Sequence, residues 1–309
     1  LAPSHVTSVE AVAHLCDAEV DNLFQGSKEI TFRPGQLTGG RFEFDVGTAG
    51  SISLVLQSCL VPAALSKSRV IMDIKGGTDV KWSMPFDYMQ EVFVPQMQRY
   101  ADIELKLVRR GFYPKGQGEV ELKVKGKYTL ENIDEAPPVR LGKQGHLMQI
   151  KGVSFASSEL QEAEVAERQQ RAARRALAKY DVPIQIRTEY CETASAGTGV
   201  VLWAIFSRDP DDIDVMNPIR LGADALGEKG KRAEVVGEEA AKKLIAEIEK
   251  GAAVDQHMCD NMIPFVALFG GKMKTSELTK HAKTNVYTVS KFLGERLEVD
   301  ETKGLIKRV

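Results

Sequence analysis

The chain has 309 residues, of which 43% are hydrophobic and 27% are charged, which is typical of a globular protein and excludes a disordered or fibrous one. Its formal net charge of −2 excludes an overall attraction to nucleic acid, so any polyanion site must come from a local cluster of lysine and arginine. No hydrophobic run approaches the roughly 20 residues that a membrane-spanning helix needs. The length is that of about two domains.

The four cysteines lie far apart and lack the spacing of a metal site. Scattered cysteines of this kind are typical of a reducing compartment. We therefore expect a cytoplasmic protein, or a nuclear one if the source has a nucleus.

The N-terminal segment predicts one helix and two strands. Ser4 is a suitable N-cap, and hydrophobic residues from Val6 to Cys16 recur with helical spacing. Residues 29–33 and 41–46 alternate as strands do, and the glycine and proline residues between them suggest a hairpin.

Two later stretches share one order of elements, which is helix, strand, helix and hairpin. The first has a helix at 52–65, interrupted near Pro62, a strand at 69–74, a helix at 86–100 and strands at 103–108 and 119–124. The second has a helix at 258–269, a strand at 272–277, a helix at 284–293 and strands at 296–299 and 304–309. This is a repeat of architecture rather than of sequence. Because the N-terminal segment lacks the first helix and strand of this order, we expect the first repeat to be incomplete.

Residues 147–252 follow a different order. We expect a strand at 147–155, a charged helix at 159–180, strands at 183–191 and 199–207, an acidic loop at 208–214 and an amphipathic helix at 233–250. Such a segment is long enough to form its own small core. We therefore predict two domains, a core of residues 1–146 plus 253–309 and an inserted domain of residues 147–252.

Two segments suggest a ligand on local grounds. Glycine-rich residues 47–51 directly precede a helix, where backbone amides could hold a phosphate, and the alternative is a plain helix-start turn. The tip of the hairpin after the second helix could grip a nucleic-acid backbone and stack a base, and the alternative is a solvated tip. The residues at this tip are Arg109, Arg110, Phe112, Tyr113 and Lys115.

Two of the five histidines draw attention. Structural or surface positions are expected for His5, His14 and His146. His257 occurs with Asp255 and Asp260, which suggests a metal, but a zinc site is disfavoured because no second histidine follows at i+4. His281 is flanked by Lys280 and Lys283, which would attract phosphates. On local grounds His281 is either a nucleophile or a cap or surface residue before a helix.

Several stretches, taken together, resemble the RNA 3′-terminal phosphate cyclase family. They are SKEITF at 27–32, GTAGS at 47–51 through Gln57, KGGTD at 75–79, RGFYPKG at 110–116, and residues 255–261 and 281–285. These stretches span nearly the whole chain in order. The resemblance implies an α/β core of repeated units, each with helices packed on a four-stranded sheet, as in the enolpyruvyl transferases. It also implies a smaller inserted α/β domain.

The resemblance further implies ATP-dependent conversion of an RNA 3′-phosphate end to a 2′,3′-cyclic phosphate. In the family a histidine attacks the α-phosphate of ATP and becomes linked to AMP. AMP then passes to the RNA 3′-phosphate, and the neighbouring 2′-hydroxyl displaces it. A neutral imidazole suits this chemistry because it is a competent nucleophile near neutral pH. A divalent ion such as Mg²⁺ would offset the charge of the triphosphate.

Site residues follow from the resemblance by position. His281 matches the nucleophile that becomes linked to AMP. The positions that match ATP contacts are Gln57, Pro85, His257, Asp260 and Asn261. The sequence departs from the family at His257 and Asn261, where tyrosine and glutamine are usual, and at Gln117, which replaces a glycine. The family's N-terminal glycine-rich segment, which carries a metal-linked acid, has no counterpart in this sequence, so no metal ligand is assigned.

Two alternatives compete with the cyclase interpretation. Non-catalytic relatives act as interaction proteins in ribosome assembly, but they lack the nucleophilic histidine. An enolpyruvyl transferase would share the fold, but the inserted domain and the segment around His281 disfavour it.

Overall fold

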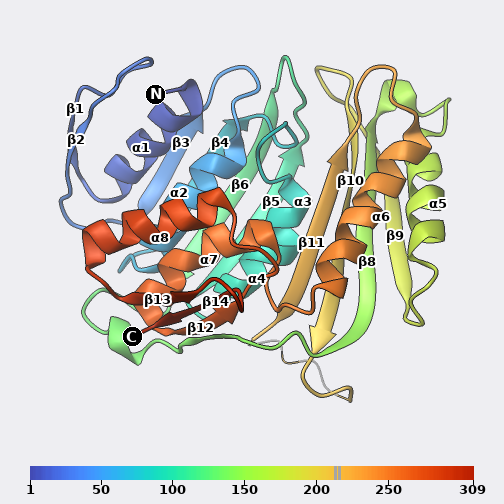
Figure 1. The fold of residues 1–309 in the computed structure, drawn as a ribbon. Helices are drawn as coiled ribbons and strands as arrows, with labels where there is room; N and C mark the ends of the chain where they lie inside the picture. Colours follow the sequence, from blue (N-terminus) through green and yellow to red (C-terminus); the bar gives the residue numbers. More distant parts are fainter. Residues whose placement is uncertain (212–213, 215–216) are drawn as a thin grey trace.

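The computed structural model describes residues 1–211, 214 and 217–309 (Figure 1). Part of the acidic loop predicted at 208–214 therefore lies outside the described residues. The described chain forms an α/β fold with three four-stranded sheets and one two-stranded sheet, as the resemblance implies. None of its described helices is long and apolar enough to span a bilayer.

The first of the two predicted repeats forms a four-stranded sheet with helices, which we call the second unit (residues 40–126). Its strand order is β3-β4-β6-β5, with β3 parallel to β4 and the other neighbours antiparallel, so the predicted β5–β6 hairpin is confirmed. Helix α2 continues through Pro62, because its buried residues hold its last turn in place. The elements are β3 (Gly40–Asp45), α2 (Ile52–Ala64), β4 (Val70–Gly76), α3 (Phe86–Tyr88), α4 (Val94–Met97), β5 (Ala101–Arg109) and β6 (Gly118–Gly126).

The C-terminal repeat, which we call the third unit (residues 139–141 and 256–308), has the same topology. Its strand order is β7-β12-β14-β13, again with the first pair parallel and the others antiparallel. The shared order confirms the predicted repeat of helix-bearing four-stranded sheets. The elements are β7 (Val139–Leu141), α7 (Gln256–Phe269), β12 (Gly271–Lys274), α8 (Lys280–Leu293), β13 (Leu297–Asp300) and β14 (Leu305–Arg308).

The N-terminal segment differs from the prediction. The expected hairpin is wrong, because β2 pairs with β1 while β3 joins the second unit beside β4. Gly39 permits this crossing, since a Cβ there would lie 2.4 Å from the Cβ of Ser68. The N-cap is Ala2, whereas Ser4 Oγ accepts a hydrogen bond from Ser51 N at 3.2 Å. The elements are α1 (Pro3–Leu15), β1 (Glu19–Asp21) and β2 (Thr31–Arg33).

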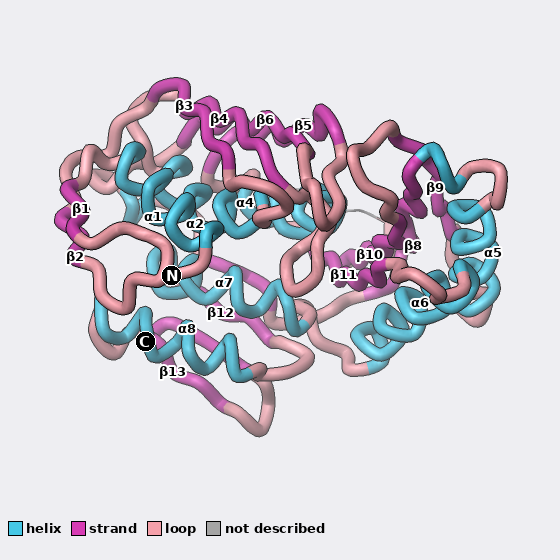
Figure 2. The backbone as a smooth tube through the Cα atoms, turned by 90° about the horizontal axis from the view of Figure 1, so that it is seen from above, coloured by secondary structure: helices cyan, strands magenta, loops and turns pink. Residues whose placement is uncertain are grey.

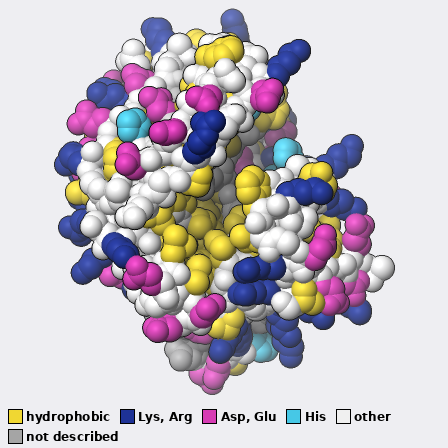
Figure 3. All heavy atoms as spheres, turned by 90° about the vertical axis from the view of Figure 1, so that its left-hand side faces the viewer, with side chains coloured by type: hydrophobic (Ala, Val, Ile, Leu, Met, Phe, Trp, Pro, Cys, Tyr) yellow, Lys and Arg dark blue, Asp and Glu magenta, His cyan; other side chains and the backbone are white. Residues whose placement is uncertain are grey.

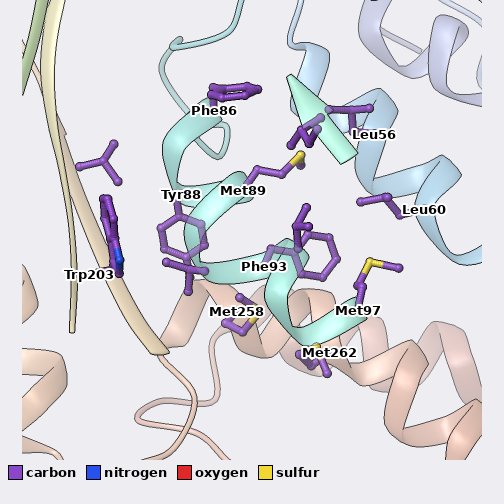
Figure 4. Packing of buried hydrophobic residues seen from close by; sticks show 14 of the residues in the cluster. Leu56, Leu60, Phe86, Tyr88, Met89, Phe93, Met97, Trp203, Met258 and Met262 are labelled. Carbon is purple, nitrogen blue, oxygen red and sulfur yellow. The ribbon is translucent and has the colours of Figure 1, made fainter. Parts of the chain in front are cut away.

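An irregular helical stretch lies at the centre of the core (Figure 4). A π-helical turn, Met89–Phe93, separates α3 from α4, so the helix predicted at 86–100 bulges in its middle. Its buried side chains, among them Tyr88 and Met97, face α2, α7 and the neighbouring strand β10 (Thr198–Ser207). The buried residues of these partners are Leu56, Leu60, Met258, Met262 and Trp203 (Figure 4). This stretch therefore joins the second unit to the rest of the molecule.

Residues 146–249 build the remaining four-stranded sheet, with order β11-β10-β8-β9. Helices α5 and α6 pack against each other and cover one face of that sheet (Figures 1 and 2). Strand β11 was not predicted. The elements are β8 (His146–Ser157), α5 (Val165–Leu177), β9 (Ile184–Cys191), β10 (Thr198–Ser207), β11 (Ile219–Leu226) and α6 (Ala233–Glu249). The domain boundary at 147–252 stays a prediction.

Hydrophobic side chains also reach the surface on one side of the molecule. Seen from the left-hand side of Figure 1, they gather in a hollow at the middle of the face, and charged side chains lie around it (Figure 3). Helix α1 and strands β1 and β2 lie on this side of the molecule (Figure 1). This face is therefore less polar at its centre than at its rim.

Candidate functional site

A cavity of about 630 Å³ lies where the second unit, the third unit and residues 146–249, which we call the inserted segment, meet. Helix α2, the loop before α3, strand β11 and helices α6, α7 and α8 all contribute to it. The six residues singled out in the sequence line this one cavity, and they are Gln57, Pro85, His257, Asp260, Asn261 and His281. The fold thus brings together residues that are up to 224 positions apart in the chain.

Helix α8 carries His281 in its first turn. Thr279 is the N-cap, and its hydroxyl accepts a hydrogen bond from Ala282 N at 3.0 Å. This cap starts the helix at Lys280, so the prediction that His281 lies before the helix is wrong. The His281 side chain is exposed. The backbone amides of a first helical turn are unpaired within the helix and favour an anion, which makes this end of α8 suitable for phosphate.

Asp260 ties α7 to the start of α8. Thr279 donates its hydroxyl proton to Asp260 Oδ1 at 3.1 Å, and Asn285 Nδ2 donates to the backbone oxygen of Asp260 at 3.0 Å. Burial raises the pKa of the Asp260 carboxyl, while the Thr279 hydrogen bond and nearby His281 oppose the rise. These contacts fix the orientation of the turn that carries His281.

The other predicted residues form two unlike walls of the cavity. Pro85 is buried directly before α3, and Gln57 is half-buried on α2. His257 and Asn261 lie one turn apart on α7, where Asn261 Nδ2 donates to the backbone oxygen of His257 at 2.8 Å. The cavity thus has an apolar contact at Pro85 and a polar side along α7.

Asp255 caps α7 and is fully buried. One carboxylate oxygen accepts from Tyr88 Oη at 2.6 Å, His257 N at 3.0 Å and Met258 N at 2.9 Å, and the other accepts from Gly222 N at 2.9 Å. Burial raises the pKa of Tyr88 well above its ordinary value. Asp255 is therefore a structural joint between α7, α3 and β11. The part of the chain that the structure describes holds no group of three side chains suited to a metal.

Eight further described residues line the cavity, and three of them that sequence reasoning missed are Trp82, Asp224 and Lys243. Lys243 of α6 donates to the backbone oxygen of Asp224 at 2.8 Å. Burial raises the pKa of Asp224, and Lys243 opposes the rise. Trp82 is 97% exposed at a positive φ of 62°. One signal was readable, because Asp224 is the lone charged residue in a run of small and hydrophobic residues at 221–226.

Comparisons with known proteins bear on this site. A sequence model of the family described as RNA 3′-terminal phosphate cyclase matches residues 1–299. The chain belongs to this family. Among similar proteins of that name, those of Pyrococcus abyssi, Ignicoccus hospitalis and Sulfurisphaera tokodaii are 40%, 41% and 40% identical to it. The matches cover 98%, 99% and 100% of this chain and 84%, 84% and 86% of the relatives.

In this family member the hairpin tip at 110–117 is only partly solvated, because Tyr113 and Lys115 are exposed whereas Arg110 and Phe112 are buried. Arg110 is buried and bonds three carboxylates, those of Asp79 at 3.0 Å, Asp87 at 2.7 Å and Glu189. Its guanidinium lies 4.1 Å from the ring centre of Phe155, and buried Phe112 stacks on that same ring. Both interpretations are wrong for Arg110 and Phe112, because the inserted segment covers them.

Residues 47–51 form a helix-start turn in the structure. Ser51 caps α2 by accepting from Leu54 N at 3.3 Å. Gly116 packs against the turn so closely that a Cβ on it would lie 1.7 Å from the oxygen of Thr48. Residues 47–51 do not contribute to the described lining of the cavity around His281. The geometry therefore favours the turn over the phosphate cradle.

Proposed function

We propose that this chain uses ATP to convert the 3′-phosphate end of RNA to a 2′,3′-cyclic phosphate through a covalent His281–AMP intermediate. The observation that carries the proposal is that His281 shares one cavity with the five residues expected to contact ATP. Its volume of about 630 Å³ lies within the range of about 300–1,000 Å³ that is common for small-molecule sites. Membership of a family whose members carry the cyclase name supports the same activity.

Three displacements make up the proposed reaction. A ring nitrogen of His281 attacks the α-phosphorus of ATP, the bond to the bridging oxygen breaks, and pyrophosphate leaves. An oxygen of the RNA 3′-phosphate then attacks the same phosphorus, which breaks the N–P bond and frees His281. The neighbouring 2′-hydroxyl finally attacks the 3′-phosphorus, loses its proton and expels AMP. Activation by AMP is needed because a free phosphate monoester is a poor electrophile.

Residues around His281 support these steps in separate ways. Backbone amides at the start of α8 would stabilise phosphate oxygens beside the nucleophile. Lys243, at the edge of the cavity, would add a charge-assisted hydrogen bond to a phosphate. Asp260 acts through Thr279 and Asn285, because its hydrogen bonds hold the first turns of α8 in place. It is a positioning residue for His281 in this proposal.

A divalent cation such as Mg²⁺ is expected to accompany the triphosphate of ATP. The described residues do not form a fitting protein site, since no three candidate ligands gather among them. We therefore assign the ion no protein ligand and no step of its own.

The decisive experiment tests His281 as the nucleophile. After incubation with ATP labelled at the α-phosphate, the wild-type chain should gain the mass of one AMP in an acid-labile, base-stable bond. His281→Ala should gain none, whereas His146→Ala, which changes an exposed histidine outside the cavity, should label normally. Labelling that persists in His281→Ala refutes the assignment. A wild-type chain that never labels would instead favour a non-catalytic interaction protein.

His257 provides a second test of the site. His257→Ala should weaken ATP use and still label, because His257 lines the cavity without forming the covalent bond in this proposal. The measurement is the ATP concentration that gives half-maximal labelling. If His257→Ala labels no AMP while His281→Ala labels normally, the two roles are reversed.

A further inference from the structure

A second, larger depression lies on the outer face of the third unit's sheet. It measures about 1,370 Å³ and is formed by β7, β12, β14, the turn between β13 and β14, and neighbouring loops. Nine lysine and arginine residues line it beside two glutamates, although the whole chain has a net charge of −2. We call this depression the cationic groove.

Positive side chains lie directly opposite one another across the strands of the cationic groove. Lys272 of β12 is in register with Arg140 of β7 on one side and with Lys307 of β14 on the other. Like charges in such positions destabilise a sheet. The fold therefore carries a repulsion here that a bound anion would relieve.

Acids neutralise part of the positive charge of the groove, since Lys303 pairs with Asp300 at 2.9 Å and Lys250 pairs with Glu277 at 3.4 Å. Lys307 pairs with Glu298 at 3.0 Å. Arg140 and Lys272 are exposed, Lys274 is half-buried, and the described residues provide no ion pair to any of the three. Within the described part of the chain these three charges therefore lack an acid partner, and we call them the unpaired cations.

The cationic groove lies close to His281. Leu278, three residues before His281, lines the groove. Because consecutive Cα atoms are about 3.8 Å apart, the Cα atoms of Leu278 and His281 are at most about 11 Å apart. Lys283, two residues after His281, pairs with Glu301 at 2.7 Å, and Glu301 also lines the groove. The segment that leads into α8 thus lines the groove, and α8 itself lines the cavity.

We propose that the cationic groove binds the phosphodiester backbone of the RNA whose 3′-phosphate end enters the His281 cavity. This inference rests on the proposed function, which supplies the RNA. A row of unpaired cations suits a strand of regularly spaced phosphates. The lining, as far as the structure describes it, contains no aromatic side chain on which a base could stack, so the groove recognises backbone charge without reading sequence.

The test removes the three unpaired charges together, in Arg140→Gln/Lys272→Gln/Lys274→Gln. Binding of a 3′-phosphorylated RNA long enough to cover the groove is measured by fluorescence anisotropy over a range of salt concentrations. For single-stranded RNA, each phosphate contact contributes about 0.7 to the slope with which the logarithm of affinity falls against the logarithm of salt concentration. The loss of three contacts should therefore lower the magnitude of this salt slope by about 2. At 0.1 M salt the affinity should fall about a hundredfold. A 3′-phosphorylated dinucleotide should bind as it does to the wild type.

A matched control makes the same charge change elsewhere, in Lys28→Gln/Lys125→Gln/Lys242→Gln, three exposed lysines outside the groove and the cavity. This control should bind long RNA like the wild type. Wild-type affinity and slope in the groove variant overturn the proposal. Failure of AMP uptake by the wild type would count against the proposed function alone, because the RNA measurement needs no ATP. If the triple variant unfolds, Lys272→Gln alone should lower the slope by about 0.7.

Discussion

The second and third units share one strand order, yet their outer faces carry different charge patterns. In the second unit Lys75 lies between Asp45 and Glu119 in register, so the sign of the charge alternates across the strands. In the third unit Lys272 has a cation on both sides. The same topology supports both patterns. The charge pattern on the outer face of a unit's sheet is therefore not set by the fold. The pattern of the third unit is best explained by a ligand.

Acids also lie opposite one another in the second unit, which sharpens the contrast. Asp73 is in register with Glu43 and Glu121. Arg41 bonds Asp73 at 2.6 Å, and Lys123 bonds Glu121 at 2.8 Å and lowers its pKa. Like charges in this sheet are thus neutralised by neighbouring side chains. Among the residues described, Lys307 of the third unit pairs with Glu298, but Arg140 and Lys272 have no such partner.

The helices α2 and α7 extend the comparison to the interior. Ser51 accepts one backbone N–H as the cap of α2, whereas buried Asp255 accepts four hydrogen bonds as the cap of α7. Asp255→Ala should lower the free energy of unfolding by at least about 3 kcal/mol, because each orphaned buried donor costs about 1–3 kcal/mol. Ser51→Ala should cost about 1 kcal/mol. Urea denaturation of both variants measures the two values.

Asp255→Asn serves as the control for that pair, since an amide keeps one acceptor oxygen and should recover part of the loss. Equal costs for Asp255→Ala and Ser51→Ala would contradict the view that the third unit depends on its cap more than the second does. Such a result would mean that water or a rearranged Tyr88 replaces the lost carboxylate.

Carboxylates beside the two hairpins give the next test, because their pKa values move in opposite directions. Burial raises the pKa of Asp87, beside the β5–β6 hairpin, to about 6, although Arg110 opposes the rise. Hydrogen bonds from Thr302 and Lys303 lower the pKa of half-buried Asp300, in the β13–β14 hairpin, to about 2. The second unit's hairpin is covered by the inserted segment, and the third unit's hairpin is open.

The pKa of Asp87 is higher in the folded protein than in the unfolded chain, so the protonated carboxyl favours folding. This contribution to stability is complete below about pH 4 and is lost as the pH rises through about 6. The shift of about 2 units corresponds to about 3 kcal/mol. Asp87→Asn removes this titration, so the stability difference between wild type and variant should be larger at pH 4 than at pH 7. For Asp300→Asn the difference should grow as the pH rises above 2. Denaturation curves at several pH values check both, and the same trend in both variants would contradict the comparison.

Sequence patterns predicted the parts of this fold that repeat over many residues. Helices at 52–65 and 258–269 were found within two residues of their ends, because a buried face recurs along each. Strands β1 and β7 have three residues each, too few for a pattern. The expected N-terminal hairpin failed because β3 pairs with a strand about 30 residues further along the chain, which local turn signals do not report.

The candidate site was predictable only in part, for a related reason. Local patterns left His281 undecided, and the resemblance supplied the six residues that the structure places in one cavity. Lys243 and Asp224 reach that cavity from the inserted segment, and no spacing rule connects them to His281. The cationic groove depends on strand register, which aligns Arg140 with Lys272 across 131 intervening residues. Tertiary contacts of this range carry no signal in a single sequence.

Charge reversal at the two central lysines gives the smallest expected effect and the most direct comparison of the sheets. Lys272→Glu places an acid between two cations and should stabilise the fold, whereas Lys75→Glu places an acid between two acids and should destabilise it. Each substitution should change the free energy of unfolding by between about 0.2 and 1 kcal/mol per cross-strand pair, and this effect should shrink in high salt. Thermal denaturation at low and high salt measures both. If Lys272→Glu destabilises the fold as Lys75→Glu does, the repulsion in the third sheet is already relieved in the free protein, and the argument from unpaired charge to an RNA ligand fails.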